Sequence, residues 1–161
     1  MRSEASPTEK FHGWFVRAIE KLKELPEGDG AFAALMIAFP LYEKYIRAKL
    51  KLAGKSEATQ DEIRGEINAD LGVTDAQRKV FWDVYRVGFT HQAMGKTGHT
   101  NWSVSDHFGA LPEFRTINGN QSVCIDPWKF TDRVLSKFVD DPRLITASES
   151  FPWADVFEVR E

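Results

Sequence analysis

The sequence predicts a mainly α-helical bundle of four to five helices with one small β-hairpin. Apolar residues recur at helical spacing through the first 96 residues, which indicates amphipathic helices. The dipeptide Asn118–Gly119, which favours a two-residue hairpin turn, separates two β-prone segments. At 161 residues, 42% of them hydrophobic, the chain can bury a core as one domain. We expect a single domain over 1–161, with its core at about 8–96 and an elaboration over 97–161.

Two long amphipathic segments open the chain. Thr8 can cap the first helix, and Pro26 stops it. The second helix is expected over roughly 30–53, with Pro40 inside it producing a bend. Its C-terminal part is basic, which indicates either a solvated face or a patch that attracts phosphate: Lys44, Arg47, Lys49, Lys51 and Lys55.

Two further helices follow. The third is short and acidic, and it is expected over 56–70 with Ile63 and Ile67 as its apolar anchors. The fourth begins at a cap on Thr74 or Asp75 and runs to about 94. Gly95 is a natural stop for it.

The pattern changes beyond position 96. Residues 97–112 are expected to form a loop, and the strands 113–117 and 121–125 to form the hairpin. Asp126 can then cap a fifth helix with Pro127 at its first position. The final segment to 161 is expected to be irregular and held to the body by aromatic residues: Phe151, Trp153 and Phe157.

Composition narrows the class of protein. The net charge of −3 argues against a generally basic nucleic-acid binder, although a local basic patch stays possible. The single cysteine, Cys124, excludes an internal disulfide framework. The first ten residues lack the apolar core of a signal peptide, and the apolar run 31–40 is too short to span a membrane. We therefore expect a cytoplasmic protein without membrane contact.

The fourth helix holds the candidate chemistry. On a regular helix His91 falls within one apolar stripe. A histidine in this position is either a hydrogen-bonded core residue or a catalyst. Arg86 borders a second stripe that contains Tyr85, and either pairs with a carboxylate such as Glu43 or Asp83 or binds a phosphate. Arg86 and His91 lie about 140° apart. One site can use both only if the helix is distorted or if two copies meet there, and the second apolar stripe makes a dimer reasonable.

The segment Arg86–Gln92, RVGFTHQ, resembles the Arg-x4-His signature of the HEPN superfamily (higher eukaryotes and prokaryotes nucleotide-binding). In that family the signature lies on a late helix of a small α-helical bundle. The family's second helix often carries a polar or acidic residue, and Glu43 is similarly placed here. The resemblance covers roughly residues 8–96.

The resemblance implies a metal-independent endoribonuclease that works as a homodimer through the 75–95 helix and needs no cofactor. Arg86 would bind the scissile phosphate and His91 would transfer a proton, because histidine titrates near neutral pH. Such proteins serve in toxin–antitoxin pairs, defence or RNA processing, so an antitoxin is a possible partner besides RNA. Supporting residues would be Glu43, Gln92 and Tyr85, and RNA-binding residues Lys44, Arg47, Lys51 and Lys96.

Two alternatives stay open. Val87 stands where active members often have a polar residue. This change either removes a supporting hydrogen bond or marks a catalytically inactive HEPN-type module that binds a partner protein or nucleotide. A zinc site from His91, His99 and His107, with Asp106 and Cys124 nearby, is conceivable, but these residues lack a close ligand pair with the usual spacing. We therefore expect no metal.

Overall fold

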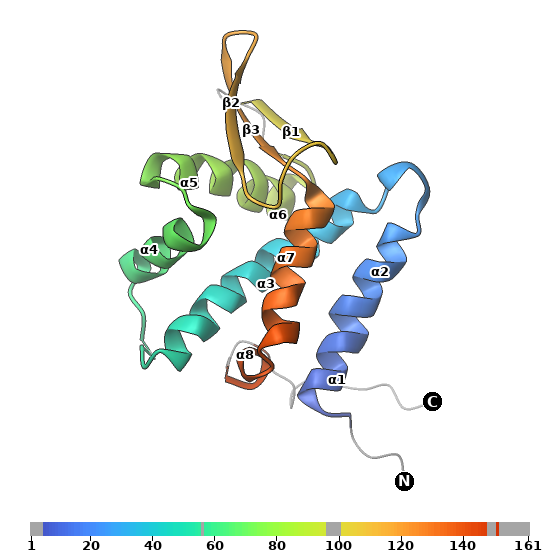
Figure 1. The fold of residues 1–161 in the computed structure, drawn as a ribbon, viewed down its shortest axis with the longest axis vertical. Helices are drawn as coiled ribbons and strands as arrows, with labels where there is room; N and C mark the ends of the chain where they lie inside the picture. Colours follow the sequence, from blue (N-terminus) through green and yellow to red (C-terminus); the bar gives the residue numbers. More distant parts are fainter. Residues whose placement is uncertain (1–4, 56, 96–100, 148–150, 152–161) are drawn as a thin grey trace.

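A bundle of helices with a small three-stranded sheet at one end forms the protein (Figure 1). The computed structural model describes residues 5–55, 57–95, 101–147 and 151. Helix α3 (Ala31–Leu52) crosses the middle of the bundle, and α7 (Pro127–Asp140) packs along it. The predicted fold class, a mainly α-helical bundle with a small β element, is confirmed.

The first helical segment begins earlier than predicted. Ser6, and not Thr8, caps α1 (Pro7–Phe11), because Ser6 and Glu9 form a reciprocal capping box around a proline at the first helical position. A π-helical segment, η1 (His12–Val16), leads into α2 (Arg17–Lys23). The short 3-10 turn η2 (Pro26–Gly28) then reverses the chain towards α3.

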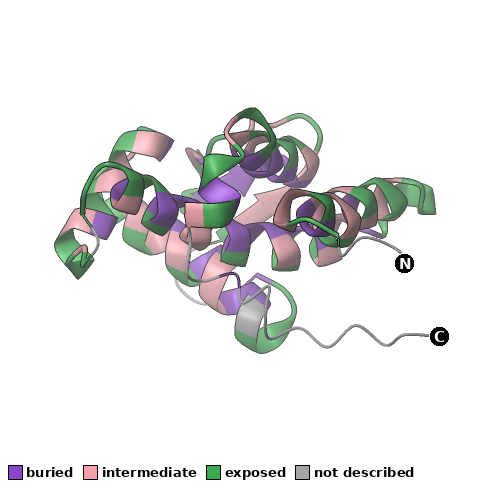
Figure 2. Cartoon of the chain, turned by 90° about the horizontal axis from the view of Figure 1, so that it is seen from below, coloured by how far each residue is buried: buried purple, intermediate pink, exposed green. Residues whose placement is uncertain are grey.

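The core is aromatic and centres on α3. Phe39 lies midway along this helix, is 1% exposed, and contacts rings from the 75–92 region and from α7: Phe81, Trp82, Tyr85, Phe89 and Phe130. Buried positions face inward between the helices, whereas exposed positions cover the outer surface (Figure 2). Burying side chains of this size supplies a large share of the hydrophobic stabilisation.

The predicted third and fourth helices are present with shifted ends. α4 (Gln60–Leu71) starts at a Thr59–Glu62 capping box and ends at Gly72 in the left-handed region. The fourth helix consists of α5 (Asp75–Phe81), the π-helical segment η3 (Trp82–Val87) and α6 (Gly88–Gln92). It ends at Ala93, whose φ of 57° breaks the helix two residues before the predicted stop at Gly95.

The hairpin is confirmed, and a third strand joins it. Strands β2 (Glu113–Ile117) and β3 (Asn120–Ile125) pair antiparallel around Asn118 and Gly119, whose φ values of 52° and 79° suit a tight turn. Strand β1 (Asn101–Val104) pairs parallel with β3, so the strand order is β1-β3-β2. The prediction of a loop throughout 97–112 was therefore wrong for residues 101–104.

The C-terminal part returns to the bundle. Asp126 caps α7 as predicted, accepting hydrogen bonds from the backbone N–H groups of Trp128 at 2.8 Å and Lys129 at 3.0 Å. The short helix α8 (Arg143–Ala147) was not predicted. Phe151 is buried against Phe11 and Phe138, which confirms its anchoring role, whereas Trp153 and Phe157 lie outside the described residues. None of the helices in the described part of the chain is long and apolar enough to cross a membrane.

Candidate functional site

Arg86 and Glu43 form the central ion pair of the candidate site. Arg86 lies in η3, and its Nε and Nη2 both donate to Oε2 of Glu43 on α3, at 3.0 and 2.7 Å. The two side chains are 27% and 29% exposed, so the pair is partly desolvated and each charge needs the other. Of the partners that the sequence left open for Arg86, the structure shows Glu43. This contact joins the helix of the Arg-x4-His segment to the second long helix.

His91 is exposed, and the expectation that it lies within an apolar stripe was wrong. The π-helical turns of η3 contain more residues per turn than an α-helix, so positions beyond them are rotated from a regular helical projection. His91 also lies in the last turn before the break at Ala93. Within the described residues no hydrogen bond or ion pair joins His91 to Arg86. Gln92 is likewise exposed.

Tyr85 belongs to the scaffold and not to an accessible site. Its side chain is fully buried, and its hydroxyl lies 2.8 Å from the carbonyl oxygen of Ser103 on β1 and 2.9 Å from that of Val123 on β3. Burial raises the pKa of Tyr85, so the hydroxyl stays protonated and donates to these carbonyls. Tyr85 and Phe89 fill the interior of a single chain, which accounts for the apolar stripe from which a dimer was expected.

A cleft of about 190 Å³ opens beside the Arg86–Glu43 pair, between α3, α4 and the α5–η3 helix. Three arginines from three elements converge on it: Arg47 from α3, Arg64 from α4 and Arg78 from α5. The full lining is Glu43, Arg47, Gln60, Ile63, Arg64, Ile67, Arg78 and Trp82. Because Arg86 already neutralises Glu43, the lining has a positive excess. Such a cleft suits an anion. We call it the arginine cleft.

The structure places the predicted RNA-binding residues in different surroundings. Arg47 lines the arginine cleft. Lys44 instead lies over the ring of Phe151, 5.0 Å from its centroid, and burial lowers its pKa. Lys51 lies in the last turn of α3 and is half-buried, and Lys96 is outside the described residues. Sequence reasoning missed Arg64 and Arg78. The spacing of four between Arg78 and Trp82 is the one signal that could have placed an arginine beside this aromatic ring.

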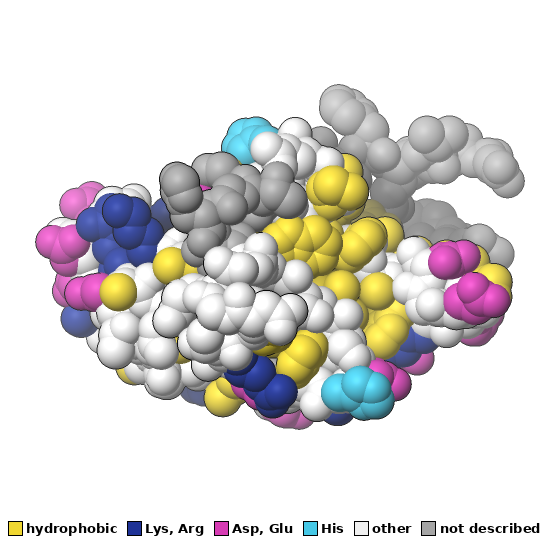
Figure 3. Space-filling model, turned by 90° about the horizontal axis from the view of Figure 1, so that it is seen from above, with side chains coloured by type: hydrophobic (Ala, Val, Ile, Leu, Met, Phe, Trp, Pro, Cys, Tyr) yellow, Lys and Arg dark blue, Asp and Glu magenta, His cyan; other side chains and the backbone are white. Residues whose placement is uncertain are grey.

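A second cavity, of about 620 Å³, lies at the sheet end of the molecule. Its lining is acidic and aromatic, with Glu27, Asp29 and Asp106 beside Phe32 and Trp128. Apolar side chains gather on the face at this end (Figure 3).

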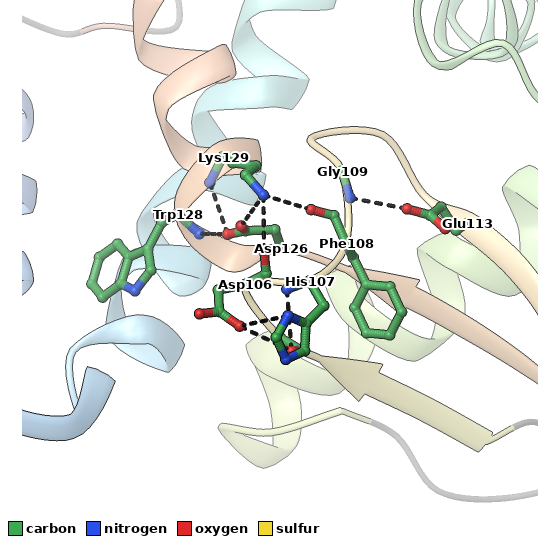
Figure 4. A network of polar contacts seen from close by, with 9 residues as sticks. Asp106, His107, Phe108, Gly109, Glu113, Asp126, Trp128 and Lys129 are labelled. Carbon is green, nitrogen blue, oxygen red and sulfur yellow. Dashed lines mark hydrogen bonds and ion pairs between the residues drawn. The ribbon is translucent and has the colours of Figure 1, made fainter.

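A polar network lies next to this second cavity and shares Asp106 and Trp128 with its lining (Figure 4). Lys129 Nζ lies 3.0 Å from the Asp126 carboxylate and donates to the carbonyl oxygens of Asp106 and Phe108, both at 2.9 Å. The Lys129 charge is thereby used to hold the loop after β1 onto the start of α7.

No metal site forms among the described residues, which contain no group of three or more histidine, cysteine and acidic side chains placed to hold an ion. His107 is exposed beside Asp106, with Nδ1 3.5 Å from its carboxylate, and Cys124 is buried in β3. His99 lies outside the described residues. The structure therefore does not assemble the histidine–cysteine set that the sequence left conceivable from residues it describes.

Comparison with known proteins does not assign the chain to a class. No protein-family model, curated protein or solved structure matches it significantly. The functional argument therefore depends on the residues of the arginine cleft, the Arg86–Glu43 pair and His91.

Proposed function

We propose that the protein is a HEPN-type endoribonuclease that cleaves RNA without a metal ion and acts as a homodimer in a toxin–antitoxin, defence or RNA-processing role. The observation that carries this proposal is the exposure of His91, which stands five residues after a partly exposed Arg86 on the same helical segment. Both side chains of the signature are therefore within reach of solvent. The resemblance of Arg86–Gln92 to the HEPN signature supplies the reaction class.

The chemistry divides between two groups. Arg86 would bind and stabilise the scissile phosphate, since a guanidinium matches phosphate geometry and charge. His91 would take a proton from the ribose 2′-hydroxyl or give one to the leaving oxygen, and its exposure leaves the imidazole accessible to RNA. Because the two side chains do not meet within one chain, a second copy would supply the partner group.

A catalytically inactive HEPN-type module that binds nucleotide or a partner protein is the second candidate. The observation that favours it is that Glu43 accepts hydrogen bonds from both Nε and Nη2 of Arg86, so this edge of the guanidinium is occupied. Val87 adds no polar group beside it. Such a module would bind a ligand and leave RNA intact.

Cleavage of an RNA pool in EDTA separates the two candidates. We expect the wild type to cleave, and Arg86→Ala and His91→Ala to lose at least about a hundredfold in rate, the usual scale for removal of an acid–base group. His107→Ala is the matched control, since His107 is also an exposed histidine and belongs to another part of the fold. Unchanged circular dichroism would show that each variant is folded. Full cleavage by both site variants would contradict the proposal, and no cleavage by the wild type would favour the inactive module.

A further inference from the structure

We infer that the arginine cleft binds the phosphate group of a ribose monophosphate, with the phosphate on Arg47, Arg64 and Arg78 and the sugar against the apolar wall. The cleft adjoins the Arg86–Glu43 pair, but the inference does not rest on the proposed cleavage, because none of the three arginines belongs to the Arg-x4-His segment. The shared ligand chemistry is a terminal phosphate on a ribose, as in a free nucleotide or at the phosphorylated end of an RNA.

Arg78 points to a missing ligand. Its side chain is only 15% exposed, and its Nε is buried without a hydrogen-bond partner among the described residues. A buried donor left unsatisfied costs roughly 1–3 kcal/mol, and such groups are rare in folded proteins. An oxyanion in the adjoining cleft would accept from this group and remove the cost.

The carboxylates near the three arginines leave room for an anion. Arg64 and Arg78 contact Asp61 and Asp75 at 3.1 and 3.2 Å, and both aspartates are largely exposed. Both pairs are solvated on the aspartate side, where water screens the charges, so a ligand can replace the aspartates. Asp75 also accepts a 2.7 Å hydrogen bond from Asn68 Nδ2 and therefore keeps a partner when Arg78 turns to the ligand.

Arg47 is the most available of the three cations. It is exposed, lines the cleft and makes no ion pair with another residue in the described part of the chain. Glu43, the carboxylate within the lining, is held by Arg86. An incoming anion therefore meets three guanidinium groups without having to displace the Arg86–Glu43 pair.

Size and polarity define the ligand further. A cleft of about 190 Å³ is smaller than the roughly 300–1,000 Å³ of sites that enclose drug-sized molecules, so it fits a phosphate with its sugar and leaves a base outside. A terminal phosphate carries about two negative charges at neutral pH and offers three oxygens, which matches three arginines better than a phosphodiester does. The apolar part of the lining, Ile63, Ile67 and Trp82, suits the ribose face.

Calorimetric titration at constant ionic strength tests the inference with three probes: adenosine 5′-monophosphate, adenosine and inorganic phosphate. We expect the monophosphate to bind, inorganic phosphate to bind more weakly and adenosine not to bind. Arg47→Gln and Arg64→Gln should each weaken monophosphate binding about tenfold, because each removes a charge-assisted hydrogen bond. Both residues are exposed, so the variants are expected to fold.

Arg115→Gln is the matched control, because the Arg115 and Arg64 side chains are equally exposed and Arg115 lies on β2. It should bind the monophosphate as the wild type does. The titration has no cleavage readout, which keeps a failure of this inference distinct from a failure of cleavage. Absence of monophosphate binding, or binding unchanged in both cleft variants, would overturn the inference. Equal affinity for inorganic phosphate would overturn the contact with ribose.

Discussion

At the scale of single residues, Asp70 is a buried carboxylate that three side chains from two other helices hold in place. Its side chain is 5% exposed and accepts hydrogen bonds from Arg133 Nη1 at 2.8 Å, Lys137 Nζ at 2.9 Å and the Tyr42 hydroxyl at 2.9 Å. Burial alone would raise the pKa of Asp70, but the hydrogen bonds from Arg133, Lys137 and Tyr42 outweigh it and lower the pKa to about 2. The network connects the end of α4 to α7 and α3.

This depressed pKa makes stability depend on pH. The ordinary pKa of the Asp70 carboxyl is 3.8, so its contribution is complete above about pH 4 and is lost as the pH falls towards 2. We expect Asp70→Asn to lower the free energy of unfolding by about 3 kcal/mol at pH 7, because it leaves two cations without their partner. Urea denaturation from pH 7 to pH 2.5 should show a flatter decline below pH 4 for this variant than for the wild type.

Asp61→Asn is the control for the Asp70 experiment. Its side chain is 91% exposed and forms only a local pair with Arg64. It should follow the wild-type pH profile closely. If Asp70→Asn showed the same steep acid decline as Asp61→Asn, the buried network would not be the source of the pH dependence.

At the scale of elements, the start of α7 depends on one capping side chain. Asp126 accepts two backbone hydrogen bonds and pairs with Lys129, and the residue is 2% exposed. We expect Asp126→Ala to lower the free energy of unfolding by about 2 kcal/mol, the upper end of the range for lost caps, since the freed N–H groups are partly buried. Thermal denaturation followed by circular dichroism measures this loss. Asp132→Ala, an exposed change on the same helix, should cost less than about 1 kcal/mol.

The elements that the sequence predicted are those with local signals. Asn118–Gly119 identified the hairpin, and Asp126–Pro127 identified the start of α7, because turn and cap chemistry depends on neighbouring residues. Strand β1 was missed, since four residues are too few to show alternation and its partner β3 is distant in sequence. The π-helical turns of η3 carry no comparable sequence signal, and neither does the helix end at Ala93, so a regular helical projection misplaced His91.

The candidate site was only partly predictable for the same reason. Glu43 was one of two carboxylates proposed for Arg86, and Arg47 belonged to a visible run of basic residues. The arginine cleft arises only when α4 and α5 fold back against α3, which brings Arg64 and Arg78 to Arg47. The spacing of the three arginines along the chain does not indicate that they lie close together in the fold.

At the scale of the whole molecule, the proposed nuclease depends on self-association. Neither Arg86→Ala nor His91→Ala homodimers contain both groups, whereas a mixed dimer contains one Arg86 and one His91 in its shared site. We expect a mixture of the two variants, reassorted through dilution and concentration, to recover about a quarter of the wild-type rate. Random reassortment makes about half of the dimers mixed, and each mixed dimer keeps one of the two Arg86–His91 pairs of a symmetric dimer. The RNA cleavage assay in EDTA measures the recovery.

Solution mass provides the check on this experiment. The wild type should have twice the 18.3 kDa mass of one chain at the concentration used for cleavage. A monomer that cleaves RNA at full rate would contradict the composite site. So would a mixture whose rate equals the sum of its inactive components.

The order of strands in the sheet has a consequence for how the chain reaches its native state. Strands β2 and β3 are joined by a two-residue turn. Strand β1 pairs parallel with β3, with Asn101 opposite Ser122, so a longer stretch of chain separates these two partners. Closing the longer loop costs more chain entropy, so the hairpin is expected to form first and β1 to add afterwards. The single proton of the Tyr85 hydroxyl is shared between carbonyls of β1 and β3. The contact with Ser103 can therefore form only after β1 has docked, which makes the surroundings of Tyr85 a reporter of the final step of folding.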